Sequence, residues 1–167
     1  MSDAQLQVRQ LNAEDIASVS ALARVVWQST YPELISQAQI DAMLADRYAT
    51  THIRTQQNDP AHGWWVAHQD LTLVGFAHAM MESTDCKLDK LYVHPDTQRQ
   101  GVGRSLLLAI QQWARRQHAG RLWLQVNRGN TQAIMAYQSY GFRIIESRVF
   151  DIGEGFVMDD HIMEQRL

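Results

Sequence analysis

Apolar and polar residues alternate along this chain with two different periods, and each period predicts a different kind of element. A period of two residues predicts strands, which we expect at residues 7–11, 63–68, 71–81, 87–93, 121–126, 142–150 and 156–163. A period near 3.6 residues predicts helices, which we expect at residues 12–31, 36–45, 101–118 and 131–140. Residues 50–57 have a weaker helical pattern and are not counted in the order of elements.

The resulting order of elements is β-α-α-β-β-β-α-β-α-β-β, which is typical of the α/β (α+β) class. This order predicts a mixed central sheet of about seven strands with helices on both faces. The length suits a single core, and no linker, repeat or low-complexity segment divides the chain. We therefore expect one domain over residues 1–167.

Composition and charge argue against several functional classes. Hydrophobic residues make up 46% and charged residues 20% of the chain, as in an ordinary globular protein. The formal net charge of −3 predicts no nucleic-acid partner, and the apolar stretch at residues 73–81 is too short to span a membrane. A single cysteine, Cys86, and a polar N-terminus without a signal peptide favour a cytoplasmic location. The seven histidines form no His-x-x-x-His pair, so we expect no metal site.

The most informative segment joins the strand at 87–93 to the helix at 101–118. Its sequence is Gln98-Arg99-Gln100-Gly101-Val102-Gly103. The first N–H groups of a helix lack intrahelical partners, and the helix dipole adds positive potential at the same end. Glycines let a large anion approach the backbone closely. The arrangement predicts a phosphate site, although glycines in an ordinary strand–turn–helix connection would give the same pattern.

Two common phosphate-binding loops do not fit this segment. A P-loop has the pattern Gly-x-x-x-x-Gly-Lys-Ser/Thr, but Gly103 is followed by Arg104. The dinucleotide-binding fingerprint requires a third glycine at position 106, which is Leu106. The pattern that remains is Gln-x-x-Gly-x-Gly between a strand and a helix.

This hexapeptide resembles the coenzyme A pyrophosphate loop of the GNAT superfamily of N-acetyltransferases. The preceding run Leu91-Tyr92-Val93-His94-Pro95, the following Leu106 and Leu107, and the segment from Asn130 to Phe142 are also similar to the family. The order of elements is that of the GNAT fold. The resemblance implies a mostly antiparallel central sheet and a single N-acetyltransferase domain. It also implies acetyl-CoA as co-substrate without a metal, and transfer of an acetyl group to a primary amine.

The resemblance assigns cofactor contacts to three parts of the chain. The loop and the helix start would bind the pyrophosphate through backbone N–H groups, and the strand before them would offer main-chain groups to the pantetheine arm. Asn130 would cap the helix at 131–140 and contact the cofactor. Relatives often carry a lysine near the 3′-phosphate where this chain has Ser139, so Arg99 or Arg104 could supply that charge. The cofactor-binding positions are then Leu91, Tyr92, Val93, Gln98, Arg99, Gln100, Gly101, Val102, Gly103, Arg104, Asn130 and Tyr137.

Tyr137 takes the general-acid position of the family, four residues before Gly141. Its hydroxyl would donate a proton or a hydrogen bond to the leaving sulfur. Tyr140 is a rival donor, because it lies three residues further along the same helix. A lone tyrosine on a helix is otherwise most often a packing residue.

The general base has several candidates. Many relatives carry a glutamate near position 87, where this chain has Lys87, a poor base at neutral pH. Asp89 points to the same face of the strand and could act through a water, unless water alone is the base. Asp159, Asp160 and His161 on the closing hairpin are further candidates, although an exposed polar face near a turn would explain at least one of them.

The acceptor side is predicted from aromatic residues and from the subgroup that the chain resembles. Trp27 and Tyr31, and with them Trp64 and Trp65, could line an acceptor pocket, although large aromatic residues are more often in the core. The segment around Trp27 and residues 150–160 resemble a bacterial subgroup of small-molecule acetyltransferases, some of which acetylate polyamines. We therefore expect a small-molecule amine as substrate. The alternatives are a protein or peptide N-acetyltransferase and a catalytically silent CoA-binding regulatory module. Relatives often form dimers, which makes a homodimer compatible with the resemblance.

Overall fold

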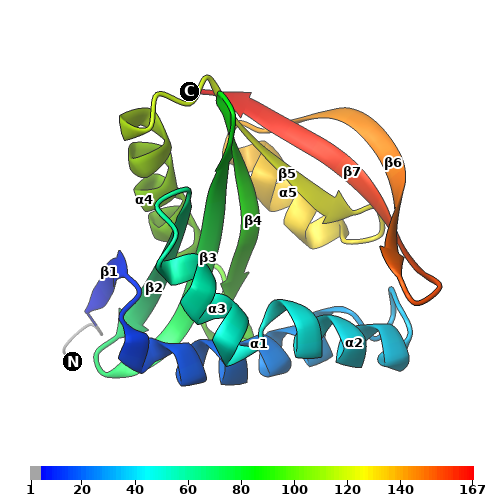
Figure 1. The fold of residues 1–167 in the computed structure, drawn as a ribbon, viewed down its shortest axis with the longest axis horizontal. Coiled ribbons are helices and arrows are strands. Elements are labelled where there is room, and N and C mark those ends of the chain that lie inside the picture. The colour runs from blue at the N-terminus through cyan, green and yellow to red at the C-terminus, as the bar shows by residue number, and fades with distance from the viewer. Residues whose placement is uncertain (1–4) are drawn as a thin grey trace.

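The structure is a computed structural model that describes residues 5–167 (Figure 1). Within these residues the strands are β1 (Leu6–Gln10), β2 (His62–Gln69), β3 (Thr72–Glu82), β4 (Asp85–Val93), β5 (Arg121–Asn127), β6 (Arg143–Gly153) and β7 (Phe156–Arg166). The α-helices are α1 (Ile16–Thr30), α2 (Gln37–Arg47), α3 (Thr50–Gln57), α4 (Val102–Arg116) and α5 (Thr131–Ser139). Short 3-10 helices cover Ala13–Asp15 and Pro95–Thr97.

All seven strands belong to one sheet in the order β1-β2-β3-β4-β5-β7-β6. β4 and β5 run parallel, and every other neighbouring pair is antiparallel. The prediction of a mixed, mostly antiparallel sheet of about seven strands is confirmed. In Figure 1 the long β6–β7 hairpin curves away from the first four strands, so the sheet opens at its centre.

Helices cover both faces of the sheet, as predicted, and each face has its own core. On one face α4 packs against β1 to β4 through its buried residues, which include Leu106, Ile110 and Trp113. On the other face α1, α2 and α3 enclose a second cluster, in which Trp27 and Ile53 pack near Phe76 of β3. The candidate active site is lined by residues of both cores.

The segment at residues 50–57 corrects the predicted order of elements. It forms a complete helix, α3, so three helices rather than two separate β1 from β2. Its only buried residue is Ile53, and a helix with a single apolar anchor has little amphipathic periodicity. The packing of Ile53 into the second core, rather than its own sequence pattern, explains why this helix forms.

A β-bulge in β4 determines which side chains reach the centre of the molecule. Leu88 pairs with Ala79 of β3 and Lys90 pairs with His78, so Asp89 between them has no partner on that strand. An extra residue in a strand reverses the facing of everything beyond it. Leu88 accordingly packs in the α4 core, whereas Tyr92 packs against the core beneath α1.

Candidate active site

The segment before α4 has the geometry expected of an anion-binding loop. Arg99 and Gly101 both adopt positive φ, at 63° and 84°. A side chain at Gly101 would be strained in this conformation, although a Cβ there would meet no atom within 4 Å. α4 begins at the next residue, so its first N–H groups face the open space beside the loop without intrahelical acceptors. This end of the helix therefore presents a row of N–H donors and the positive end of its dipole.

β4 and β5 diverge just before this loop. The two strands pair only at Cys86 with Leu122 and at Lys87 with Trp123. Beyond these pairs a cavity of about 500 Å³ separates them. Its wall is built by α1, α2, β4, the α4 loop, β5, α5 and the β6–β7 hairpin.

Most of the predicted site residues line this single cavity. The catalytic candidates Tyr137 and Asp89 do so, and the proposed substrate contacts Trp27 and Tyr31 do as well. The cofactor-binding candidates in the wall are Leu91, Tyr92, Val93, Gln98, Arg99, Gly101, Val102, Gly103 and Asn130. Gln100 and Arg104 lie outside the wall, and the Gln100 side chain instead accepts a hydrogen bond from Gln69.

α5 positions the tyrosine predicted as the acid. Asn130 caps this helix, because its side-chain oxygen accepts a hydrogen bond from the N–H of Ala133 at 3.3 Å. Tyr137 follows two turns later and packs edge-on against Phe142, with ring centroids 5.6 Å apart. Burial raises the pKa of Tyr137, with smaller contributions from Tyr31 and Tyr140, so the hydroxyl keeps its proton at neutral pH. The Tyr137 hydroxyl is therefore protonated across the full physiological pH range.

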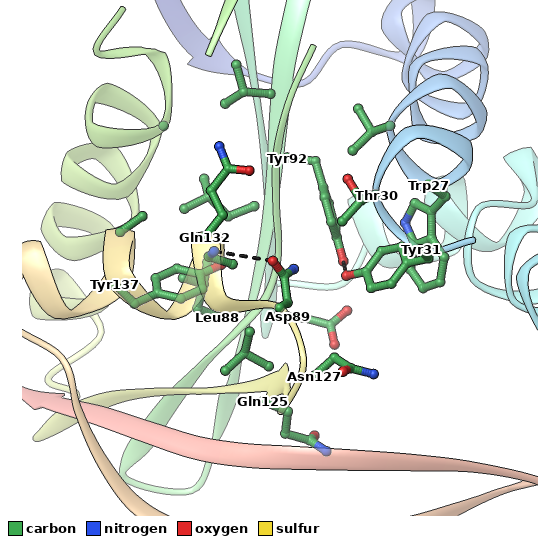
Figure 2. A pocket seen from close by; sticks show the side chains of 18 of the residues that line it. Trp27, Thr30, Tyr31, Leu88, Asp89, Tyr92, Gln125, Asn127, Gln132 and Tyr137 are labelled. Atoms are coloured by element: carbon green, nitrogen blue, oxygen red, sulfur yellow. Dashed lines mark hydrogen bonds between the residues drawn. The ribbon is translucent and has the colours of Figure 1, made fainter. Parts of the chain in front are cut away.

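An aromatic cluster lies across the cavity from Tyr137 (Figure 2). The rings of Trp27 and Tyr31 have centroids 4.3 Å apart, and the hydroxyls of Tyr31 and Tyr92 are hydrogen-bonded at 3.1 Å. The indole N–H of Trp27 donates to the Tyr48 hydroxyl at 3.0 Å. These bonds satisfy the polar ends of buried aromatic side chains and hold their rings in fixed positions. The cluster thus forms one wall of the cavity.

Asp89 is part of a closed hydrogen-bonded network that runs into the protein. Its Oδ2 accepts from Nδ1 of His78 at 2.8 Å and also from the ammonium of Lys90. Nε2 of His78 lies 2.8 Å from Nδ1 of His62. His78 is fully buried and Lys90 is only 5% exposed, so these groups depend on one another for their hydrogen bonds.

The network sets the protonation of its members. Burial alone would raise the pKa of Asp89, but the hydrogen bond from His78 and the charge of Lys90 outweigh it and hold this pKa well below its usual value. Burial lowers the pKa of His78 to about 4 despite the nearby carboxylate, so His78 is neutral at pH 7. Neutral His78 donates from Nδ1 to Asp89, and its Nε2 accepts from His62. Asp89 is consequently an ionised but weak proton acceptor.

A second carboxylate, that of Asp160 of β7, lines the same cavity but differs from Asp89 in its hydrogen bonding and in the direction of its pKa shift. The residue is 2% exposed, and its Oδ1 has no hydrogen-bond partner among residues 5–167. Burial raises the pKa of Asp160 to about 6, and this rise exceeds the opposing effect of Arg47 and Lys87. A carboxylate that is both buried and unpartnered is rare in folded proteins.

Sequence reasoning missed several residues of the wall and included some that lie elsewhere. Arg47, Gln125 and Asn127 line the cavity but belong to no recognised motif, and only the three-dimensional arrangement identifies them. Trp64 and Trp65, which were expected near the acceptor, are buried in the two cores instead. Their strand, β2, is separated from the opening between β4 and β5 by β3, which explains this correction.

Two of the base candidates point away from the cavity. Side chains alternate along β7, so the neighbours of Asp160 face the opposite side of the strand. Asp159 pairs with Arg128 at 3.1 Å, and Nδ1 of His161 is 2.7 Å from the Ser147 hydroxyl. The structure thus selects one of the three hairpin candidates for the cavity wall.

Within residues 5–167 no group of three or more histidine, cysteine, aspartate or glutamate side chains could hold a metal ion. No helix in the same range is long and apolar enough to cross a membrane.

Comparison with known proteins places this geometry in a family. Residues 24–142 match the model of the acetyltransferase (GNAT) family. A spermidine N(1)-acetyltransferase from Thermoplasma acidophilum is 24% identical over 159 residues, which cover 92% of this chain and 96% of the relative. The crystal structure of the PaiA N-acetyltransferase from the same organism, solved with coenzyme A, superposes with a TM-score of 0.85. It covers 98% of this chain and 99% of that chain at 23% identity.

A second kind of relative matches a shorter part of the chain. The [ribosomal protein bS18]-alanine N-acetyltransferase of Escherichia coli is 35% identical over 74 residues, which cover 44% of this chain and 50% of the relative. Its crystal structure superposes with a TM-score of 0.72 over 97% of this chain and 94% of that chain, at 20% identity.

Proposed function

Because the chain belongs to the acetyltransferase (GNAT) family, we propose that it transfers the acetyl group of acetyl-CoA to a primary amine of a small molecule. Direct attack of the neutral amine on the thioester carbonyl forms a tetrahedral intermediate. A polyamine is the acceptor class with the best support, since one relative that matches nearly the whole chain is a spermidine N(1)-acetyltransferase.

The opening between β4 and β5 suits coenzyme A. The N–H groups at the start of α4 and the positive φ of Gly101 favour a pyrophosphate at that end. Leu91 and Val93 lie beyond the last β4–β5 pair, so their main-chain groups have no partner on β5 and could bond the pantetheine arm as an added strand would. Arg99, which lines the cavity beside the loop, would supply positive charge for the phosphates.

Tyr137 is the proposed acid of the reaction. As the carbon–sulfur bond breaks, the thiolate takes a proton from a nearby donor. Tyr137 lines the cavity and keeps its hydroxyl proton at neutral pH. Tyr140, the rival donor, also lines the cavity, so the roles of the two tyrosines must be distinguished by substituting each of them.

The shape of the acceptor end is the observation that carries the proposal of a small substrate. Phe150, Ile152 and Met158 of the β6–β7 hairpin line the same cavity as Trp27 and Tyr31 of the α1 region. Two segments far apart in the chain therefore contribute side chains to the same end of the cavity. An extended peptide needs an open groove, whereas a cavity bounded by side chains of both segments suits a compact amine.

Asp89 serves the acceptor side by its charge in this proposal. Its carboxylate is ionised at neutral pH and faces the cavity, so it favours a cationic substrate such as a polyamine. Its hydrogen bonds from His78 and Lys90 and its lowered pKa make it a poor acceptor for the substrate proton.

Two alternatives remain open to test. The match to the alanine N-acetyltransferase favours a protein or peptide substrate. A catalytically silent CoA-binding module would keep the α4 loop but would not need a buried, protonated tyrosine opposite the aromatic cluster.

The decisive experiment is an acceptor panel with acetyl-CoA, followed by release of free thiol. Polyamines, amino acids, aminoglycosides and peptides with a free N-terminus are compared, and the proposal predicts the highest kcat/KM for a polyamine. A peptide as the best acceptor would favour the second function, and no thiol release above hydrolysis would favour the silent module. Tyr137→Phe should lower kcat about 10- to 100-fold with unchanged CoA affinity, whereas Tyr140→Phe should leave kcat nearly unaltered.

A further inference from the structure

The cavity contains one buried carboxylate with no structural partner. Asp160 lies on β7 between Asn127 of β5 and Arg148 of β6, with which it pairs in register. Its side chain takes part in no hydrogen bond or ion pair among residues 5–167, although the residue is 2% exposed. An unpaired carboxylate in such a place costs stability, so its retention calls for a function.

The neighbours of Asp160 are otherwise engaged. The Arg148 guanidinium bonds Glu146 at 2.6 Å. Lys87 Nζ lies 5.0 Å from the centroid of the Trp123 ring and 3.9 Å from Asp89. The carboxylate of Asp160 is therefore left for a ligand in the cavity.

Charged groups face Asp160 from several elements. Arg47 of α2 and Lys87 of β4 oppose the rise in its pKa, Asp159 adds to that rise, and burial is the largest influence. The charge of Asp160 also affects a residue of the aromatic cluster. Burial raises the pKa of Tyr31, and the negative charge of Asp160 raises this pKa further. Asp160 is thus close to the acceptor end, where Tyr31 and Tyr92 meet.

We propose that Asp160 is the general base, the group that takes the first proton from the ammonium of the acceptor. This inference rests on the proposed acetyl transfer. The ammonium gives one proton to a carboxylate oxygen of Asp160, and the neutral amine then attacks the thioester carbon. As the carbon–sulfur bond breaks, Tyr137 gives its proton to the thiolate. The nitrogen loses its second proton at the same stage, and this proton returns to Tyr137 through solvent. The proton on Asp160 passes to solvent before the next cycle, which balances the reaction.

The other candidates fit this role less well. Asp89 is held ionised by His78 and Lys90, and Lys87 is a cation. Asp159 pairs with Arg128 outside the cavity wall. A base with a pKa of about 6 is ionised at pH 7 and accepts a proton more readily than an ordinary carboxylate.

The test compares Asp160→Asn with Asp159→Asn, which removes the adjacent carboxylate outside the cavity. Both are assayed from pH 5.5 to 10 with the best acceptor of the panel, whether amine or peptide, and CoA affinity serves as the folding control. Wild type should show a plateau in kcat/KM above about pH 6. Asp160→Asn should lower kcat about 100-fold or more at pH 7. Its rate should then rise about tenfold per pH unit toward the pKa of the acceptor, which is about 10 for an alkyl ammonium and about 8 for a peptide N-terminus.

The outcomes separate the two proposals. An Asp160→Asn enzyme with raised KM, unchanged kcat and the wild-type pH profile would make Asp160 a binding residue and overturn the inference. Asp159→Asn should match wild type, and an equal loss in both variants would also overturn it. If wild type acetylates small amines while Asp160→Asn is unimpaired, the proposed function stands and only this inference fails. A wild type that acetylates nothing removes both.

Discussion

The β4 wall and the β7 wall of the cavity each carry one carboxylate, and the two have opposite surroundings. Asp89 on β4 is bonded by His78 and Lys90, and its pKa is held well below the usual value. Asp160 on β7 has no partner, and burial raises its pKa to about 6. The same functional group is therefore a fixed charge on one wall and a titratable group on the other.

This difference distinguishes structural from chemical use of a buried carboxylate. A fully bonded carboxylate holds its neighbours in place, and its low pKa prevents proton uptake at neutral pH. An unbonded carboxylate destabilises the fold, but its pKa lies near the working pH of an acid–base catalyst. Three predictions, beginning with the largest effect, test whether the two walls differ in this way.

Removing the partnered carboxylate should cost the most stability. Asp89→Ala leaves the ammonium of Lys90 buried without a counterion, and the loss of one member of a buried pair typically costs about 3–5 kcal/mol. Urea denaturation followed by circular dichroism measures the change. Asp85→Ala on the same strand is the control, because its pair with Arg121 is about one third exposed and should contribute less than about 1 kcal/mol. Equal losses in both variants would mean that the Asp89 network is not a structural unit.

The histidine behind Asp89 should remain neutral under mildly acidic conditions. His78 has a pKa of about 4, against about 6.5 for an unperturbed histidine, because burial disfavours its charged form. The unfolded chain binds this proton at a higher pH than the folded chain, so the residue destabilises the fold as the pH falls from about 6.5 to about 4. Nitrogen NMR of the imidazole reports the titration directly. A midpoint near 6.5 would contradict the buried network.

Removing the unpartnered carboxylate should stabilise the protein. The pKa of Asp160 is higher in the folded chain than its ordinary value of 3.8, so the ionised group opposes folding above about pH 6. Asp160→Asn should therefore raise the free energy of unfolding by about 1–2 kcal/mol at pH 8, after allowance for solvent screening. The gain should shrink as the pH falls through 6 and vanish only below the ordinary pKa of 3.8, where the wild-type carboxyl is protonated in both states.

The control for this gain is again the neighbouring residue. Asp159 is half exposed and paired with Arg128, so Asp159→Asn should change stability by less than about 1 kcal/mol, with no gain at high pH. A loss of stability in Asp160→Asn at pH 8 would show that the carboxylate has a bonded structural role after all.

Strong periodicity and turn residues made most of the fold predictable. The long amphipathic pattern that became α4 and the glycine turn at the β6–β7 hairpin both appeared as expected. α3 was left out of the predicted order because its only buried residue is Ile53, and tertiary packing rather than local pattern stabilises it. The bulge at Asp89 has no distinctive local pattern, since an extra residue in a strand becomes visible only against its partner.

The cofactor side of the site was more predictable than the acceptor side. Loop geometry depends on neighbours in sequence, so the segment from Gln98 to Gly103 was enough to predict a phosphate site. The acceptor side is assembled from α1, α2, β4 and β7, and its residues meet only through the topology of the sheet. Strand alternation separated Asp160 from Asp159 and His161 but could not decide which face was inward. The pairing of His78 with Asp89 likewise required the register of β3 and β4.

The short pairing between β4 and β5 has a consequence for the free protein. With only two paired positions between β4 and β5, the sheet is two halves joined at a narrow seam, and the main-chain groups that face the gap beyond the seam have no strand to bond. A ligand that fills this gap with its own amides completes the sheet, so part of its binding free energy becomes folding free energy. At a ligand concentration 100 times the Kd, such linkage adds about 2.7 kcal/mol to stability. The supply of that ligand in the cell would then govern how long the enzyme survives unfolding and proteolysis, as well as how fast it works.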